Sequence, residues 1–162
     1  LVLGLEQPDS GTIYYNNEPY NSQIIWNLRK QVGYVSQDLN IGMGLVSDFY
    51  KDTMSLQNNK SLRANYESKL KDWLSFFKLS EEVLGKNIEE LSGGEKQRIV
   101  IINALLLERK FFMLDEITSA LDEELKRKVA NFFFSNNDYT ILNISHDNYL
   151  LTDFNLKTIK LG

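Results

Sequence analysis

The sequence predicts an α/β fold, a mainly parallel sheet flanked by helices, within a single domain over residues 1–162. The first supporting observation is an alternation of elements. "FFMLD" (111–115) and "YTILNIS" (139–145) are typical of strands, and the segment between them has helical periodicity. A strand, a helix and a second strand in this order form a right-handed crossover between parallel strands. The second observation is composition, because 43% hydrophobic and 25% charged residues in 162 are ordinary for a globular domain.

The N-terminal residues predict the end of a buried helix followed by a small antiparallel β piece. Residues 1–5 are mostly apolar, and the turn-forming "QPDSG" (7–11) would stop a helix there. Residues 12–15 are rich in β-forming side chains. Asn16 and Asn17 tolerate the left-handed conformation that a tight turn needs, so a second strand is expected to fold back on the first.

A short amphipathic segment and a strand come next along the chain. Residues 24–28 are amphipathic, and "QVGYVSQ" (31–37) is typical of a strand. Residues 38–60 are polar and contain Gly42 and Gly44, which we expect to act as hinges.

The middle of the chain, residues 38–90, is predicted to be an inserted helical subdomain. Its strongest signal is a set of apolar residues that recur at helical spacing, Leu62, Tyr66, Leu70, Trp73, Leu74 and Phe77. This spacing predicts a long amphipathic helix, and residues 81–84 predict a shorter one. The segments on either side mix strands and helices, which is why the helical part is interpreted as an insertion.

The C-terminal part has a regular pattern. A helix is predicted over residues 94–108, with Ser92 and Glu95 spaced as a capping box. The continuous apolar run 111–115 predicts a strand that is buried on both faces. A helix over residues 122–134 and a last strand, "LKTIKL" (156–161), complete the expected elements.

Composition and charge argue against several classes of protein. The net charge of −4, with no long basic run, argues against nucleic-acid binding. The chain has no cysteine and one histidine, which excludes disulfides and argues against a transition-metal cluster. No stretch approaches the roughly 20 apolar residues of a membrane span. The first residues also lack the basic region and cleavage site of a signal peptide.

The segment "ELSGGEKQR" (90–98) has the features of an anion-binding helix start. Gly93 and Gly94 let a ligand approach the backbone without a Cβ in the way. Free N–H groups and the helix dipole favour negative charge at this position, and the Ser92 hydroxyl adds a donor. An ordinary helix cap with a glycine turn explains the same residues, and both interpretations stay open.

Acidic side chains follow the predicted strand 111–115. Ligands of open parallel sheets bind beyond the carboxyl ends of the strands, so Asp115 and Glu116 would face such a site. Asp115 could hold Mg²⁺ through water, and Glu116 could orient or deprotonate a water that attacks a phosphate. The alternative is a solvated acidic strand end.

Gln37 and His146 close two other predicted strands. The amide of Gln37 could reach a Mg²⁺ or a water, and His146 would lie at the same sheet edge as Asp115. A single histidine is more often structural than catalytic, and a glutamine at a strand end is often without a role. Four features support one another, because Gln37, Asp115/Glu116 and His146 all lie where predicted strands end and Ser92 opens a helix that could face an anion.

At these residues the sequence resembles the nucleotide-binding domain of ATP-binding cassette (ABC) proteins. "LSGGEKQR" (91–98) is similar to the signature motif, and "FFMLDE" (111–116) to the Walker B motif with its catalytic glutamate. "SALD" (119–122) resembles the D-loop, "VSQ" (35–37) the Q-loop, and "NISHD" (143–147) the segment with the switch histidine. The resemblance covers essentially the whole chain. It implies a P-loop NTPase-like sheet with an ABC-type helical subdomain inserted between Gln37 and Ser92.

The sequence departs from the family pattern at two places. Ile117 replaces the usual proline after the Walker B glutamate, and "LDEITSALD" with "KNIEELSGGEKQRI" resembles bacterial iron-export ATP-binding subunits. No G-x-x-x-x-G-K-[ST] phosphate loop occurs. We expect that loop upstream of Leu1, so the domain would be N-terminally incomplete and residues 1–162 inactive alone.

The resemblance implies a role for each residue at the end of a strand. Asp115 and Gln37 would bind Mg²⁺, and Gln37 would also sense the γ-phosphate and couple to the partner subunit. Glu116 would be the general base for the attacking water, and His146 would contact the γ-phosphate.

The resemblance also implies a site shared between two copies of the domain. Ser92, Gly93 and Gly94 would contact the γ-phosphate of ATP bound mainly by the opposite protomer. Asp122 in the D-loop would act across the same dimer interface. Such half-sites suit phosphoryl transfer, which depends on positioning and charge stabilisation.

The function that follows from the resemblance is that of an ATP-hydrolysing transporter subunit. Its cofactors would be ATP and Mg²⁺, and its partners a second nucleotide-binding domain and a transmembrane permease, with iron or another metal as a candidate cargo. It would be cytoplasmic, on the inner face of the cell membrane, touching the membrane only through the permease and binding no nucleic acid. Two alternatives remain: a degenerate cassette that serves as an interaction module without ATPase activity, and a non-transport ABC ATPase.

Overall fold

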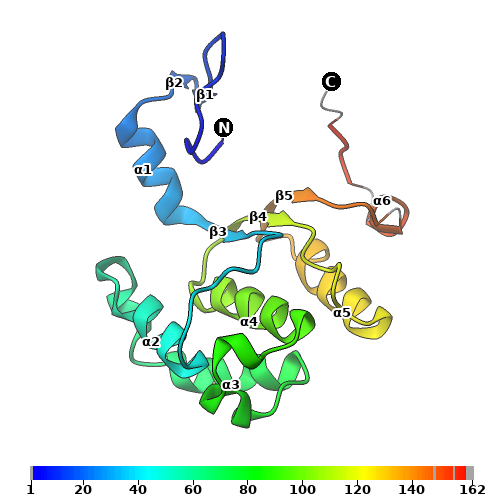
Figure 1. The fold of residues 1–162 in the computed structure, drawn as a ribbon. Helices are drawn as coiled ribbons and strands as arrows, with labels where there is room; N and C mark the ends of the chain where they lie inside the picture. Colours follow the sequence, from blue (N-terminus) through cyan, green and yellow to red (C-terminus); the bar gives the residue numbers. More distant parts are fainter. Residues whose placement is uncertain (1, 148, 155, 160–162) are drawn as a thin grey trace. The chain divides into compact units, whose positions relative to one another are not determined.

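The computed structural model describes residues 2–147, 149–154 and 156–159. The chain forms two compact units, Leu1–Val32 and Gly33–Gly162, and each is described by itself. In Figure 1 the first unit is blue, and the second begins with β3 and continues to the C-terminus.

The first unit contains a hairpin and one helix. Its elements are β1 (Tyr14–Tyr15), β2 (Glu18–Pro19) and α1 (Ser22–Gln31). The two strands pair antiparallel, and Asn16 and Asn17 between them have φ of 51° and 67°. Positive φ at both central residues is the backbone of a tight hairpin turn, so the predicted antiparallel piece is confirmed.

The predicted helix end at residues 1–5 is wrong for the residues that the structure describes. Residues 2–6 form turns and bends, and Leu5 is 71% exposed. The guanidinium of Arg29 in α1 donates to the carbonyl oxygens of Leu3, at 2.8 Å, and Gly4, at 3.2 Å. These two carbonyl groups are thus bound by a side chain of α1 and not by the backbone of a helix.

The second unit is organised on a three-stranded sheet with the order β3-β4-β5. The strands are β3 (Val32–Val35), β4 (Phe111–Asp115) and β5 (Thr140–Ile144). β4 and β5 pair parallel from Phe111 and Thr140 to Asp115 and Ile144. The predicted parallel crossover is therefore confirmed, and both strands end at the same edge of the sheet.

Only one face of this sheet is fully buried, so the prediction of a β4 strand buried on both faces is wrong. Phe112 and Leu114 are each 1% exposed, whereas on the opposite face of β5 Leu142 is 39% and Ile144 56% exposed. In Figure 1 the helices α4 and α5 lie on the same side of the strands. The apolar run of β4 therefore did not reveal that, among the described residues, the face with Leu142 and Ile144 is partly exposed.

Several helices of the second unit carry the rest of its core. They are α2 (Val46–Ser55), η1 (Gln57–Leu62), α3 (Tyr66–Phe76), η2 (Glu81–Gly85), η3 (Ile88–Glu90), α4 (Gly93–Leu106), α5 (Glu123–Phe134) and α6 (Tyr149–Asp153). One hydrophobic core joins α2, α3, α4, β4 and α5. Within it the buried Tyr50 of α2 donates its hydroxyl to the carbonyl oxygen of Ile99 in α4, at 3.2 Å.

Two predictions about this unit need correction. The polar segment after Gln37 contains α2, which was missed because Asp, Ser and Thr side chains interrupt its apolar pattern, and the helix predicted from Leu62 begins at Tyr66. The strand predicted over 156–161 is absent from residues 156–159, and its other two residues lie outside the described residues. A subdomain over residues 38–90 stays a prediction.

Candidate active site

Three side chains from three strand ends meet at the carboxyl edge of the sheet. The amide Nε2 of Gln37, beyond β3, donates to Oε2 of Glu116 at 3.0 Å. The imidazole Nε2 of His146, beyond β5, lies 3.2 Å from Oε1 of the same carboxylate. Each oxygen of Glu116 thus has one neighbour, and the sheet brings together residues that lie far apart in the sequence.

The backbone of Glu116 has an unusual conformation. Its φ is 49°, in the left-handed region that costs a side-chain-bearing residue on the order of 1 kcal/mol. Its N–H donates to the carbonyl oxygen of Ile144 at 2.9 Å, which continues the β4–β5 pairing by one residue. The side chain is 20% exposed, whereas that of His146 is 93% exposed. The carboxylate is therefore held in place, and the imidazole remains accessible.

Sequence reasoning missed Gln97, which contacts the loop that carries Glu116. This side chain of α4 is 1% exposed, and its Nε2 donates to the carbonyl oxygen of Glu116 at 3.0 Å. Its Oε1 accepts from the N–H of Ala120 at 2.9 Å. A signal existed in the sequence, because Gln97 shares a helical face with the buried Ile101 and Leu105, where an apolar residue is expected.

A second missed contact ties the same loop to the one that carries His146. The hydroxyl of Thr118 donates to Oδ2 of Asp147 at 2.7 Å. The other carboxylate oxygen, Oδ1, lies 3.4 Å from the ammonium of Lys126 on α5. Thr118 is 4% exposed, so this bond is shielded from water and fixes the loop after β4 against the loop after β5.

The predicted capping box at the start of α4 is confirmed. The Oγ of Ser92 accepts from the N–H of Glu95 at 3.2 Å, and the Glu95 carboxylate accepts from the N–H of Ser92 at 2.9 Å. The bond from the Ser92 N–H, together with the ion pair to Lys86 at 3.2 Å, holds the pKa of Glu95 below its usual value. The first N–H groups of the helix proper, those of Gly93 and Gly94, have no partner within a helix.

The two glycines of this helix start have different surroundings. A Cβ built on Gly94 would lie 2.8 Å from the carbonyl oxygen of Ala120, too close for any side chain. A Cβ on Gly93 would have no heavy atom of the described chain within 4 Å. Gly94 is therefore needed for packing against Ala120. At this helix start the backbone open to a ligand is that of Gly93, and the available hydroxyl is that of Ser92.

Asp115 and Asp122 occupy the ends of their elements. Asp122 caps α5, with its side chain accepting from the N–H of Leu125 at 2.9 Å. Asp115, the last residue of β4, is half-buried, and in the described part of the chain its carboxylate has no hydrogen bond or ion pair.

A magnesium site fits the residues at this edge. The described residues contain no group of three or more acidic, histidine or cysteine side chains that could hold a metal. Mg²⁺ does not require such a cage, because it keeps several of its waters and binds through one or two carboxylates together with phosphates. The unpaired carboxylate of Asp115 and the amide oxygen of Gln37 are ligands of this kind.

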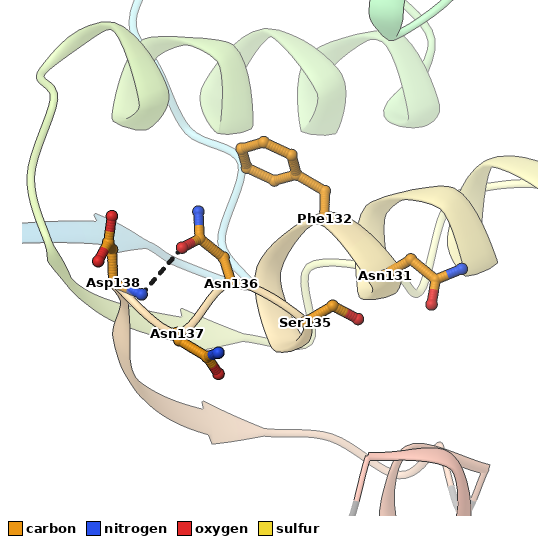
Figure 2. Close-up of a pocket in the computed structure, with 6 residues that line it drawn as sticks. All are labelled: Asn131, Phe132, Ser135, Asn136, Asn137 and Asp138. Carbon is orange, nitrogen blue, oxygen red and sulfur yellow. Dashed lines mark hydrogen bonds between the residues drawn. The ribbon is translucent and has the colours of Figure 1, made fainter.

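Two hollows of the second unit lie away from these residues. One of about 440 Å³ is formed by the turn between α5 and β5, as Figure 2 shows, where the N–H of Asp138 donates to Oδ1 of Asn136 at 2.9 Å. Another of about 550 Å³ is lined by Trp73, Arg109 and Tyr139 among others. Both are near the amino end of β5, so the candidate site is an open edge and not one of these hollows.

Comparison with known proteins gives relatives of one kind. Residues 1–119 match the sequence profile of the family described as "ABC transporter". "Probable iron export ATP-binding protein FetA" of Escherichia coli K12 is 35% identical over 150 residues, 91% of this chain and 65% of that protein. "Energy-coupling factor transporter ATP-binding protein EcfA2" of Acetivibrio thermocellus is 34% identical over 88% of this chain and 52% of its own length. The chain thus spans about half to two-thirds of these relatives.

Solved structures agree on the fold. The ATP-binding cassette MJ0796, in a dimeric post-hydrolysis state bound to ADP and Pi, matches with a TM-score of 0.70 at 20% identity, over 90% of this chain and 67% of that one. The cbiO1 protein of Clostridium perfringens, part of an ABC transporter complex, matches with a TM-score of 0.59 at 27% identity, covering 90% and 60%. The α/β fold predicted from the sequence is the fold of these cassettes.

Proposed function

The chain belongs to the ABC transporter family, and on that premise we propose that its sheet edge is the hydrolytic part of an ATPase that powers a membrane transporter. The observation that carries the proposal is the meeting of Gln37, Glu116 and His146 at 3.0 and 3.2 Å. None of the described helices is long and apolar enough to cross a lipid bilayer. From the similarity to ATP-binding subunits of transporters we propose a permease subunit as partner, with the membrane touched only through it.

In the proposed reaction Glu116 is the general base. Each carboxylate oxygen has one neighbour in the structure and keeps lone-pair capacity to accept a proton from a water. The amide of Gln37 fixes one oxygen, and the exposed imidazole of His146 fixes the other while presenting an edge to a phosphate. The water is thereby oriented for attack on the γ-phosphate of ATP.

Asp115 and the amide oxygen of Gln37 would hold Mg²⁺ at this edge. Bound Mg²⁺ neutralises charge that develops on the transferred phosphoryl group. Within the described residues the Asp115 carboxylate has no other partner, and the backbone of the next residue, Glu116, is left-handed.

The helix start at Ser92 and Gly93 would complete a site on a second copy of the domain. The open backbone there, the Ser92 hydroxyl and the helix dipole favour an anion, and we assign it to the γ-phosphate of ATP bound mainly by the partner. Asp122 would act across the same interface. Metal export, with iron as the first candidate cargo, is proposed from the similarity to the iron-export protein.

Substitution Glu116→Gln tests the proposal in a protein that includes the phosphate loop expected upstream of Leu1, since residues 1–162 are expected to be inactive alone. It keeps the size of the side chain and removes the base, so ATP hydrolysis should fall by about 100-fold or more while ATP binding persists. The matched control is Glu124→Gln, which changes an exposed carboxylate on α5 and should hydrolyse ATP normally. Hydrolysis by the Glu116 variant at the wild-type rate would disprove its role. Absence of hydrolysis in the wild-type protein would favour the interaction module.

A cellular experiment tests the cargo separately. Cells that lack the protein should accumulate iron, and the wild-type gene should restore normal iron while the Glu116→Gln variant should not. Unchanged iron content, with ATPase activity intact, would reject iron as the cargo and keep the ATPase.

A further inference from the structure

The loop that carries Glu116 is held mainly through its backbone. The carbonyl oxygen of Glu116 accepts from the N–H of Ser119 at 3.1 Å and from its hydroxyl at 2.9 Å. It also accepts from the amide of Gln97 at 3.0 Å. The first two bonds are local to the turn, so Gln97 is the contact that ties this carbonyl group to another element.

The amide of Gln97 contacts both ends of the loop at once. Its Nε2 binds the carbonyl oxygen of Glu116, and its Oε1 binds the N–H of Ala120 at 2.9 Å. The nitrogen and the oxygen of one amide have a fixed separation, so both bonds form only when residues 116–120 keep one conformation. With 1% of the residue exposed, water cannot replace either bond without a rearrangement.

The close approach of Gly94 makes the same connection more rigid. Its Cα packs against the Ala120 carbonyl group, at a distance that leaves no room for a Cβ. Gly94 and Gln97 are one helical turn apart on α4 and both contact Ala120 of the loop.

We propose that Gln97 is a positioning residue for ATP hydrolysis: its buried amide holds residues 116–120 so that the left-handed Glu116 presents its carboxylate to Gln37 and His146. The inference rests on the proposed function, because it assigns how the general base of that reaction is kept in place. Gln97 is 1% exposed and binds main-chain atoms of the loop, so the role proposed for it is exerted through that backbone.

The substitution Gln97→Met tests the inference, since it keeps the length of the side chain and removes both hydrogen bonds. Displacing a catalytic group by about 1 Å can lower a rate roughly 100-fold, so kcat should fall by about tenfold to 100-fold. The KM for ATP should stay within about twofold of the wild-type value. The matched control is Asn103→Leu on the same helix, because the buried Oδ1 of Asn103 has no hydrogen-bond partner among the residues that the structure describes. Its kcat should equal that of the wild type.

The substitution Gln97→Glu makes kcat depend on pH in a way that a general loss of packing would not. A protonated carboxyl group has the shape of the amide and can donate to Glu116 and accept from Ala120, whereas a carboxylate would repel the Glu116 carbonyl oxygen. Burial raises the pKa of such a carboxyl group. The ratio of variant to wild-type kcat should therefore rise as pH falls, by about tenfold or more, and the Gln97→Met ratio should stay flat.

Dividing the kcat of each variant by that of the wild type also removes the pH effects of other charged groups near Gln97. Glu116 and His146 lie on the facing strand ends, Asp147 and Lys126 border the same loop, and Glu95 and Arg98 are on α4 itself. All of them are present in the wild type as well, so their effects on kcat cancel when the kcat of each variant is divided by that of the wild type at the same pH.

Hydrogen exchange tests the contact of Gln97 with the loop independently of activity. In the intact protein the N–H of Ala120 should exchange faster in Gln97→Met, by about tenfold or more, and remain unchanged in Asn103→Leu. Unchanged exchange at Ala120, or a Gln97→Met kcat equal to that of the control, would overturn the inference. If the wild type hydrolyses no ATP, the proposed function fails, and the exchange rate still decides whether Gln97 holds the loop.

Discussion

The two ends of the β4–β5 pair are stabilised in different ways. Near the amino end, the ring of Phe112 packs edge-on against Phe133 and Tyr139, with centroids 5.2 and 5.0 Å apart. At the carboxyl end the contacts are directional: the amide of Gln97 and the Thr118–Asp147 hydrogen bond hold a residue in a left-handed conformation.

This difference indicates what each end contributes. The free energy gained by apolar burial is roughly proportional to the buried area and depends little on direction, so the aromatic end contributes mainly to stability. Hydrogen bonds to a loop specify one geometry, so the other end supplies positioning at some cost in strain. Substitutions at the aromatic end should therefore lower the free energy of unfolding most. Those at the carboxyl end should have smaller effects on stability and larger effects on activity.

The largest effect on stability is expected for Phe133→Ala at the aromatic end. Phe133 is 0% exposed and contacts Phe112, Phe132 and Tyr139, so truncation should cost about 3–5 kcal/mol of unfolding free energy. Chemical denaturation measures it. Phe134→Ala, at a half-buried position of the same helix, is the control and should cost clearly less. If both variants lost the same unfolding free energy, the aromatic cluster around Phe112 would not be the main source of stability at this end.

An intermediate effect is expected for Gly94→Ala at the carboxyl end. The added methyl group would meet the carbonyl oxygen of Ala120, and overpacking of this kind costs about 1–3 kcal/mol. The paired variant Gly93→Ala places its methyl group in open space and should leave thermal stability unchanged or slightly raised. If both variants melt at the same temperature, helix α4 is not packed against the loop as the structure shows.

The smallest effect is expected for Glu95→Gln, about 0.3–1 kcal/mol, because glutamine keeps the capping box and only the negative charge near the helix start is lost. The pKa of Glu95 is lowered in the folded protein, mainly by the bond from the Ser92 N–H, so its stabilisation is complete above the unfolded pKa. It is lost as pH falls through the folded pKa, below the ordinary carboxyl value. Melting curves from pH 7 to pH 3 should therefore converge for variant and wild type at the acidic end. A constant difference at every pH would contradict the assignment.

Sequence patterns predicted the elements that have strong local signals. The strand 111–115, the capping box of Ser92 and Glu95, and the turn at Asn16 and Asn17 follow from apolar runs and from backbone preferences of individual residues. Elements without such signals were missed: α2 begins without a side-chain cap, and α6 is only five residues long. The short N-terminal segment was wrongly predicted as helix because its apolar residues are not packed in a core.

For the candidate site, sequence spacing identified which residues end the strands but not what holds them. Gln37, Glu116 and His146 were expected at one edge because parallel strands end together. The opposite tasks of Gly93 and Gly94 could not be predicted, since the difference depends on where the Ala120 carbonyl group lies. The Gln97 contact was likewise hidden, because its partners are main-chain atoms about twenty residues away.

The sequence by itself identified the family, the strands and helices with strong local signals, and the acidic, amide and imidazole groups at the ends of the strands. Each of these depends on residue type and local spacing, which a single chain displays directly. Only the tertiary structure decided that the Glu116 carboxylate lies between Gln37 and His146, and that Gln97 grips its loop. Such contacts depend on how distant elements pack, and packing settles distances that no local pattern encodes.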